Sequence, residues 1–211
     1  GNIDLDPTND VFSDTIYVWN NIAARRPLIE TFTSSTCPPC NAANVTAEAL
    51  FAQNTGNYTS IKYQVSFPGT GDPYYTDEVG QRMDYYMPSG TASMPRMEID
   101  GGWDQNGNNI TQQVLDDHIE SVSFINLSAT YSINIKNIEV DIIIDPLEDI
   151  SSNNLLIHAA IIEETTYNNI KTNGETQFEH VVKKMLPNAS GTQLSPLVGG
   201  AQTTEYLQYQ H

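Results

Sequence analysis

Apolar residues recur in two different rhythms along the chain, and the change between them falls near residue 123. In the first part, strand-like runs alternate with stretches whose apolar residues follow helical spacing. The expected strands are 14–20, 25–32, 58–67 and 96–100, and the expected helices are 38–53, 75–87 and 109–122. Strands that alternate with helices are typical of an α/β sheet, so this part is predicted to be an α/β domain.

After residue 123 the apolar residues recur at every second position, which is the period of a strand with one buried face. Val140, Ile142 and Ile144, for example, share one face of the run 138–145. Comparable runs follow at 125–135, 155–164, 177–186 and 204–210. A series of short alternating strands separated by turn-rich segments predicts an all-β, sandwich-like (Ig-like) domain.

The change of rhythm predicts a chain in three parts. Residues 1–24 are an Asp-rich lead-in, residues 25–123 form the α/β domain, and residues 124–211 form the all-β domain. A chain of 211 residues is long enough for two such domains.

The net charge of the chain limits the classes of partner that it is expected to bind. The chain has 9 Lys and Arg against 26 Asp and Glu, which gives a net charge of -17. Such a surface repels the phosphates of nucleic acids and the anionic lipids of membranes. We therefore expect no nucleic-acid partner. We also expect no membrane span, because no run approaches the ~18 consecutive apolar residues that a spanning helix needs.

The two cysteines, Cys37 and Cys40, lie in a CPPC motif between an expected strand and an expected helix. At a helix start, Cys37 faces unpaired N–H groups and the positive end of the helix dipole, which favour its thiolate. We expect a lowered pKa for Cys37, which makes it the attacking sulfur. Cys40 follows one turn later, close enough to form a disulfide and to resolve a mixed disulfide. Pro38 and Pro39 suit the first helical turn.

A static disulfide is the main alternative for this pair, because oxidising compartments supply structural disulfides freely. The redox-active interpretation is favoured, since a ring closed at a helix start is small and expected to be exposed to solvent. Both interpretations predict a bond between Cys37 and Cys40.

Metal binding is the weaker alternative. A structural zinc site needs four ligands, and no second cysteine pair or close histidine pair accompanies the CPPC motif. The segment 104–109, DQNGNN, has the alternating oxygens of a calcium loop but lacks its closing Glu, so a plain turn is favoured at Asp104 and calcium stays open. We expect no metal and no cofactor.

The order strand, CPPC, helix and, later, SMPRMEIDGG resembles the thioredoxin superfamily. The resemblance implies a thioredoxin-like fold, with a cis proline at Pro95 opposite the cysteines and with Met94 contacting the backbone of a bound substrate. Phe32, five residues before Cys37, matches an aromatic residue that the family places there.

Two positions depart from the family pattern. Thr36 stands where many members have a Trp, and Thr31 stands where the reductases keep a buried Asp that helps to move protons. Glu30 is one residue away and is expected on the other side of the strand. These departures argue against rapid reductase activity and leave the fold unaffected.

Three stretches carry a narrower resemblance: LIETFTSSTCPPCNAAN, DPYYTDE with RMDYYMPSGTASMPRMEIDGG, and HAAIIEE with FEHVVKKMLP. With these the whole chain resembles the twenty-eight-kilodalton outer-membrane-protein family of Bacteroidetes-type bacteria. The resemblance implies a thioredoxin-like domain followed by a β-sandwich. It also implies an extracytoplasmic location, in the periplasm, outer membrane or cell surface. The family has no settled activity.

Taken together, the sequence predicts an exported thiol–disulfide oxidoreductase that acts on protein thiols and disulfides. Cys37 attacks, Cys40 releases the product, and Pro95 and Met94 hold the substrate segment as an added strand. The β part would hold the protein to an envelope or cell-surface partner. The alternative from a different class is a surface binding or scaffold module with an inert disulfide.

Overall fold

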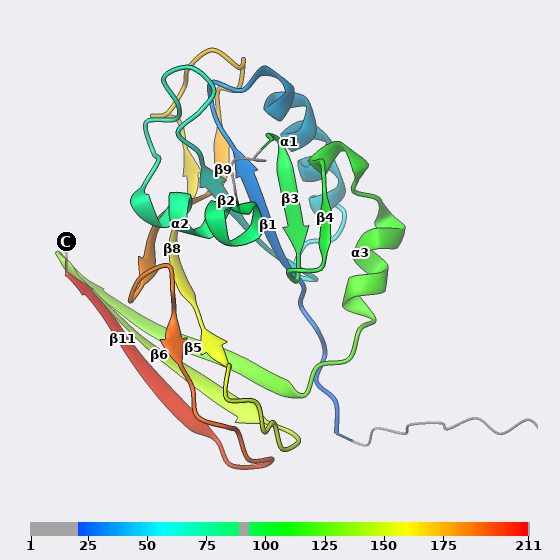
Figure 1. The fold of residues 1–211 in the computed structure, drawn as a ribbon, viewed down its shortest axis with the longest axis vertical. Coiled ribbons are helices and arrows are strands. Elements are labelled where there is room, and N and C mark those ends of the chain that lie inside the picture. The colour runs from blue at the N-terminus through cyan, green and yellow to red at the C-terminus, as the bar shows by residue number, and fades with distance from the viewer. Residues whose placement is uncertain (1–20, 89–92, 211) are drawn as a thin grey trace, which may run out of the picture.

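The computed structural model describes residues 21–88 and 93–210, so the strand expected at 14–20 lies outside the described residues. A six-stranded sheet with helices on both faces occupies one end of the molecule, and a three-stranded sheet occupies the other (Figure 1). The strands are β1 Leu28–Thr33, β2 Thr59–Gln64, β3 Arg96–Ile99, β4 Trp103–Gln105, β5 Ile125–Asn134, β6 Asn137–Pro146, β7 Leu156–Ile157, β8 Ala159–Thr166, β9 Phe178–Leu186, β10 Thr192–Gln193 and β11 Thr203–Gln210. The helices are α1 Pro38–Phe51, α2 Asp77–Tyr86 and α3 Gln112–Ile119, with a 3-10 turn η2 at Gly107–Asn109.

The three expected helices form close to their expected positions. Thr76 and Thr111 cap α2 and α3, because each threonine oxygen accepts the N–H of the residue three positions later. Strand β4 was not expected, since the sequence of this region predicts only turns. Its three residues are too few to show a period, and it forms by antiparallel pairing with β3.

The six-stranded sheet has the order β4-β3-β1-β2-β9-β8. Strand β1 is parallel to β2 and antiparallel to β3, so the sheet is mixed. Helix α2 covers one face, where Val79 packs on Phe32 and Tyr63. Helices α1 and α3 cover the other face, where Phe51 and Leu115 are fully buried. The CPPC motif follows β1 and begins α1. Its position is therefore set by the place of β1 in the sheet and by the packing of α1 on one face of the sheet.

Strands from beyond residue 124 extend this sheet. Strand β9 lies parallel to β2, with Val181 opposite Lys62, and β8 lies antiparallel to β9. The periodicity of these segments identified half-buried strands, but it carries no information about the sheet they join. The domain boundary at residues 123–124 stays a prediction, and the larger sheet contains strands from both sides of it.

The three-stranded sheet has the order β11-β6-β5. Val140, Ile142 and Ile144 lie on one face of β6, as the alternation predicted, and pack in a cluster with Leu186 and Leu197. The structure thus confirms a mixed α/β sheet accompanied by a separate β-sheet. In the described chain this second sheet has three strands.

A row of three carboxylates crosses the larger sheet beneath α2. Glu30 on β1 is opposite Glu98 on β3, which is opposite Asp104 on β4. Directly opposite residues project from the same face, so these side chains are neighbours. Arg82 of α2 donates to both oxygens of Glu30 at 2.8 and 3.0 Å, and Arg96 pairs with Glu98 and Asp104. Two guanidinium groups therefore compensate the row.

Two tyrosines complete the surroundings of Glu30, which is 2% exposed. The Tyr63 hydroxyl donates to one carboxylate oxygen at 2.9 Å, and the Tyr86 hydroxyl donates to the other. Burial raises the pKa of both tyrosines well above the ordinary value, and the charge of Glu30 raises it further. Glu30 thus faces α2, on the opposite side of β1 from Ile29, as its register predicted.

Replacing Glu30 tests the importance of this compensation. Glu30→Gln leaves the guanidinium of Arg82 buried without its charge partner, so we expect a loss of about 3 kcal/mol in the free energy of unfolding. Urea denaturation measures this loss. The control is Glu163→Gln, which weakens a half-exposed surface pair with Lys183 and should cost less than about 1 kcal/mol. Equal losses in the two variants would contradict the assignment.

Glu98 makes stability depend on pH. Burial raises its pKa to about 7, and the neighbouring Asp104 carboxylate adds to the rise. Between the ordinary carboxyl pKa and about 7, the native state keeps a proton that the unfolded chain releases, so stability from this group falls as pH rises through that window. In Glu98→Gln, the melting temperature relative to the unchanged protein should increase between about pH 5 and pH 8. A difference in melting temperature that does not change with pH would contradict this role of Glu98.

Candidate active site at the start of α1

The residue before the first helical position of α1 is Cys37. Its backbone is extended, with φ -102° and ψ 101°, and Pro38 and Pro39 occupy the first two helical positions. Because prolines carry no N–H, the first amide of the helix is that of Cys40, which donates to the Cys37 carbonyl at 3.0 Å. No acidic residue lies in the first turn. The positive end of the helix dipole at Cys37 is therefore not offset by a carboxylate in that turn.

The two sulfur atoms are joined in a disulfide, as expected from the sequence. The Cα atoms of Cys37 and Cys40 are 5.3 Å apart, which is an ordinary separation for such a bond. The ring is closed within the first turn of α1.

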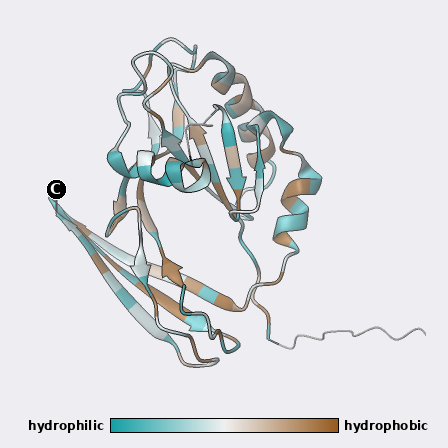
Figure 2. Ribbon diagram, viewed as in Figure 1, coloured by the Kyte–Doolittle hydropathy of each residue, from teal (hydrophilic) through white to brown (hydrophobic). Residues whose placement is uncertain are grey.

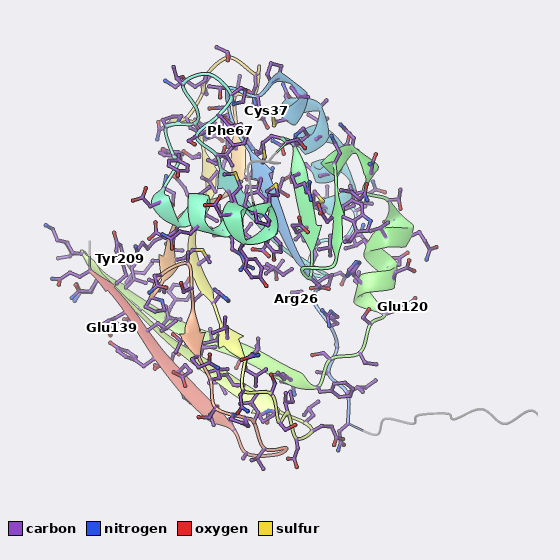
Figure 3. The ribbon with its side chains drawn as sticks, viewed as in Figure 1. Arg26, Cys37, Phe67, Glu120, Glu139 and Tyr209 are labelled. Atoms are coloured by element: carbon purple, nitrogen blue, oxygen red, sulfur yellow. A yellow bond between two sulfur atoms is a disulfide. The ribbon has the colours of Figure 1, made fainter. Side chains whose placement is uncertain are left out.

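The expected exposure of this disulfide is wrong. Cys37 is 2% exposed and Cys40 is fully buried. Figure 3 shows Cys37 and Phe67 at the same end of the molecule, where the loop after β2 meets the start of α1. Two loops, 66–75 and 167–177, bond to the residues just before Cys37. Helical spacing could place the cysteines at a helix start but could not show what lies above them.

The loop between β8 and β9 binds the turn that leads to Cys37. The carbonyl of Ser35 accepts the backbone N–H groups of Thr172 at 3.0 Å and Asn173 at 2.9 Å. The Asn173 amide donates to the Ser34 carbonyl at 3.1 Å, and the Asn41 amide donates back to the Asn173 carbonyl at 3.0 Å. Residues more than 130 positions apart thus bond to each other on both sides of the disulfide.

The loop after β2 binds the same turn from another side. The Asp72 carboxylate accepts the N–H of Ser35 at 2.8 Å, and Asn169 donates its side-chain amide to this carboxylate. The Thr36 hydroxyl donates to the Pro68 carbonyl at 2.7 Å. Both Asp72 and Asn169 are buried, so these bonds are shielded from competing water. We call the bonds from both loops to Ser34–Thr36 the polar clamp.

Pro95 and Met94 lie at the end of the sheet that carries the CPPC motif. Strands β1 and β3 are antiparallel with Phe32 opposite Arg96, so Pro95 comes next to Thr33, the last residue of β1. The peptide between Met94 and Pro95 is cis, as the resemblance implied. Pro95 is buried, and Met94 is half-buried against the core beneath α2. Their contact with a substrate stays a prediction.

Thr31 occupies the position at which, by the resemblance, thioredoxin-type reductases keep a buried Asp. Thr31 is buried and lies beside Lys62 in the parallel register of β1 and β2. The Lys62 ammonium is also buried, and it pairs with Glu48 of α1 at 2.7 Å. On this face of the sheet, the buried ammonium of Lys62 and the carboxylate of Glu48 on α1 are therefore found where the reductases have a carboxylate on the strand.

Sequence reasoning missed the residues of the polar clamp. Asp72, Asn169 and Asn173 belong to stretches rich in Gly, Asn and Thr, which indicate turns and nothing about long-range partners. Their burial is the decisive feature, and it depends on β9 joining the larger sheet. No local pattern in the sequence carries that information.

Among residues 21–88 and 93–210, no group of three or more His, Cys, Asp or Glu side chains could hold a metal ion. Asp104, the first residue of the considered calcium loop, instead lies on β4 and pairs with Arg96. No helix in the described part of the chain is long and apolar enough to cross a membrane.

Comparison with known proteins gives a likeness in fold. No family model matches the chain, and no curated protein matches its sequence. A crystal structure of a protein from Agrobacterium tumefaciens matches with a TM-score of 0.58 and 16% identity, over 89% of this chain and 79% of that one. HBP35 of Porphyromonas gingivalis matches with a TM-score of 0.61 and 12% identity, over 90% of this chain and 66% of that one.

This chain is therefore similar in fold to both proteins, and it spans about two thirds of the HBP35 chain. Porphyromonas gingivalis belongs to the Bacteroidetes, the bacterial group to which the sequence resemblance pointed. At these identities the likeness concerns the fold alone.

Removing one bond of the polar clamp should make the disulfide more reactive. Asn173→Ala loses the amide that binds the Ser34 carbonyl and also two bonds to Glu175 within the same loop. The loss of the Ser34 bond, at about 1 kcal/mol, corresponds to roughly fivefold faster opening. We expect reduction by dithiothreitol, followed by alkylation and mass measurement, to accelerate by about that factor. The exposed Asn168 of the same loop supplies the control, Asn168→Ala, which should leave the rate unchanged. An unchanged rate in Asn173→Ala would show that the clamp does not limit access.

Proposed function

We propose that this protein is an extracytoplasmic thiol–disulfide oxidoreductase that acts on protein thiols and disulfides through Cys37 and Cys40. The observation that carries the proposal is the disulfide closed at the first turn of α1. Cys37 precedes a helix whose first turn has no acidic residue, so the helix dipole favours the Cys37 thiolate once the bond is reduced.

The exchange would proceed in two steps. In the reduced protein, the Cys37 thiolate attacks one sulfur of a substrate disulfide, whose S–S bond breaks as the other sulfur leaves and takes a proton. The Cys40 thiolate then attacks the Cys37 sulfur of the mixed disulfide and releases the second substrate thiolate. The substrate gains two electrons and the protein becomes the disulfide. In the reverse direction, a substrate dithiol reduces the protein.

Pro95 and Met94 are proposed to hold the substrate segment next to the cysteine pair. This role comes from the thioredoxin resemblance, and their position beside the end of β1 supports it. Met94 is the more accessible of the two residues, which suits a direct contact. The buried Pro95 would act by fixing the backbone of its neighbour.

Access to Cys37 requires the polar clamp to open. The attacked sulfur must meet the incoming thiolate, and a residue that is 2% exposed cannot do so without local movement. The loops that bond to the turn just before Cys37 are the proposed moving part. Local openings of this kind occur at a fraction of the full unfolding free energy. The proposed enzyme would therefore be slow toward small thiols and selective for partners that bind the loops.

The burial of both cysteines favours a second candidate function. A shielded disulfide resists reduction, so the protein could serve as a surface binding or scaffold module in which the bond only fixes the start of α1. The two functions share the fold and differ in the equilibrium and the rate of the Cys37–Cys40 couple.

The proposed location is the periplasm, the outer membrane or the cell surface. The disulfide supports an oxidising compartment, and the fold likeness to a Bacteroidetes protein is in keeping with the family resemblance. The β part would hold the module to an envelope or cell-surface partner.

A redox titration separates the two functions. The protein is equilibrated with graded ratios of reduced and oxidised glutathione, and the thiol state of both cysteines is read by alkylation. We expect the bond to open within the range of the glutathione couple, and we expect Cys40→Ser to retain substrate proteins as mixed disulfides through Cys37. Cys37→Ser is the matched control and should retain far fewer. A bond that stays oxidised throughout, with no trapped protein, would establish the scaffold.

A further inference from the structure

An apolar groove lies between two sheet edges. Strand β5 is an edge of the three-stranded sheet, and β8 is an edge of the six-stranded sheet. The groove between them has a volume of about 600 Å³ and is lined by side chains of β5, β6 and β8. Figure 1 shows β8 approaching β5, and Figure 2 shows hydrophobic residues along β8 and alternating with polar residues along β5.

The hydrogen-bonding groups of β5 show which of its sides is open. The Leu147 N–H donates at 2.8 Å to the carbonyl of Phe124, one position beyond the first pair of the β5–β6 register, Ile125 opposite Pro146. In an antiparallel ladder such bonded pairs alternate, so the even-numbered residues of β5 bond to β6 and the odd-numbered ones point outward. Among the described strands, β5 pairs with β6 alone, so the outward N–H and C=O groups of four residues face no neighbouring strand: Leu127, Ala129, Tyr131 and Ile133.

One end of this open edge already accepts an antiparallel segment. The N–H of Ala23 donates at 2.8 Å to the carbonyl of Ser123, just before β5 begins. Ser123 is odd-numbered, so its carbonyl lies on the outward side of β5. The open edge is therefore accessible to a backbone in the geometry that a further strand needs.

The side chains of the same residues make the groove apolar. Leu127 is 63% exposed, Tyr131 73% and Ile133 66%, and all three share the face that lines the groove. Consecutive residues of β8, from Ala159 to Ile162, line the other wall. Side chains of a strand alternate between its faces, so consecutive residues line a groove that runs along the edge of the strand. An extended segment fits this shape better than a compact ligand.

The charge of the sheet indicates the polarity of the occupant. On the opposite face of the three-stranded sheet, Glu139, Asp141 and Asp145 of β6 lie next to neutral β5 residues. A strand added to β5 would place its side chains on that face about 10 Å from these carboxylates, about the Debye length at 0.1 M salt and slightly beyond the ~8 Å at physiological salt. The net charge of -17 acts in the same direction. Basic side chains are therefore favoured on the face of the bound segment that points away from the groove.

We propose that this groove binds an extended segment of a partner protein as an added strand on β5, with apolar side chains facing the groove and basic side chains facing outward. Backbone hydrogen bonds to the odd-numbered residues supply affinity, and the apolar pockets select alternating sequences. The proposal involves neither cysteine, so it stands or falls independently of the redox function.

The first experiment uses labelled ten-residue peptides and the full chain. A peptide of alternating Val and Lys should bind in fluorescence anisotropy, whereas a peptide of the same composition with its valines grouped, and one of alternating Val and Glu, should bind at least about tenfold more weakly. Ala129→Pro removes an outward N–H without touching the β5–β6 ladder, so it should weaken binding by a similar factor. Thr130→Ala keeps every backbone donor and is the control. Equal binding of the three peptides overturns the proposal.

Amide hydrogen exchange checks the site without a variant. The peptide should slow exchange at Leu127, Ala129 and Tyr131, whose N–H groups point outward, and not at Ser128 or Thr130, which already bond to β6. Absence of this odd-numbered pattern overturns the proposal. Protection of the same amides without peptide also overturns it. Concentration-independent protection would assign the edge to another segment of this chain, and protection that grows with concentration would assign it to a second copy.

Discussion

The pairing of β9 with β2 is the constraint on which the other features depend. It joins a hairpin from late in the chain to a sheet whose other strands come from early in it. At one end of this hairpin, the β8–β9 loop bonds to the turn before Cys37. At the other end, β8 forms a wall of the apolar groove. The bonded turn before Cys37 and the apolar groove beside β5 therefore both involve this one hairpin.

Much of the local structure could be predicted from the sequence because it is encoded locally. Helix α1 follows from two prolines that fit a first turn and from alanines that favour a helix, and the disulfide follows from the spacing of Cys37 and Cys40 on it. The alternation of Val140 and its neighbours identified β6 and its buried face. Short-range periodicity is sufficient for each of these.

The remaining features depend on long-range contacts. The exposure of Cys37 depends on Asp72 and Asn173, which are 35 and 136 positions away in sequence by their numbers, and turn-rich segments give no sign of such contacts. Strand β4 is too short to show a period and exists because β3 offers it an edge. The ion pair between Glu30 and Arg82 is likewise a long-range contact. The alternation of β1 gives the face on which the carboxylate lies but not its partner.

Strand β8 and strand β9 form a two-stranded arm that spans about 30 Å, from their length of eight to nine residues. If this hairpin moves as one stiff unit, binding at one site would alter the equilibrium at the other. Any strain that a bound strand placed on β8 would change how readily the clamp loop lifts, and thermodynamic reciprocity requires that lifting the loop changes the affinity of the groove by the same factor. The redox state of Cys37 and Cys40 and the binding of a partner strand at β5 would then influence each other through this hairpin.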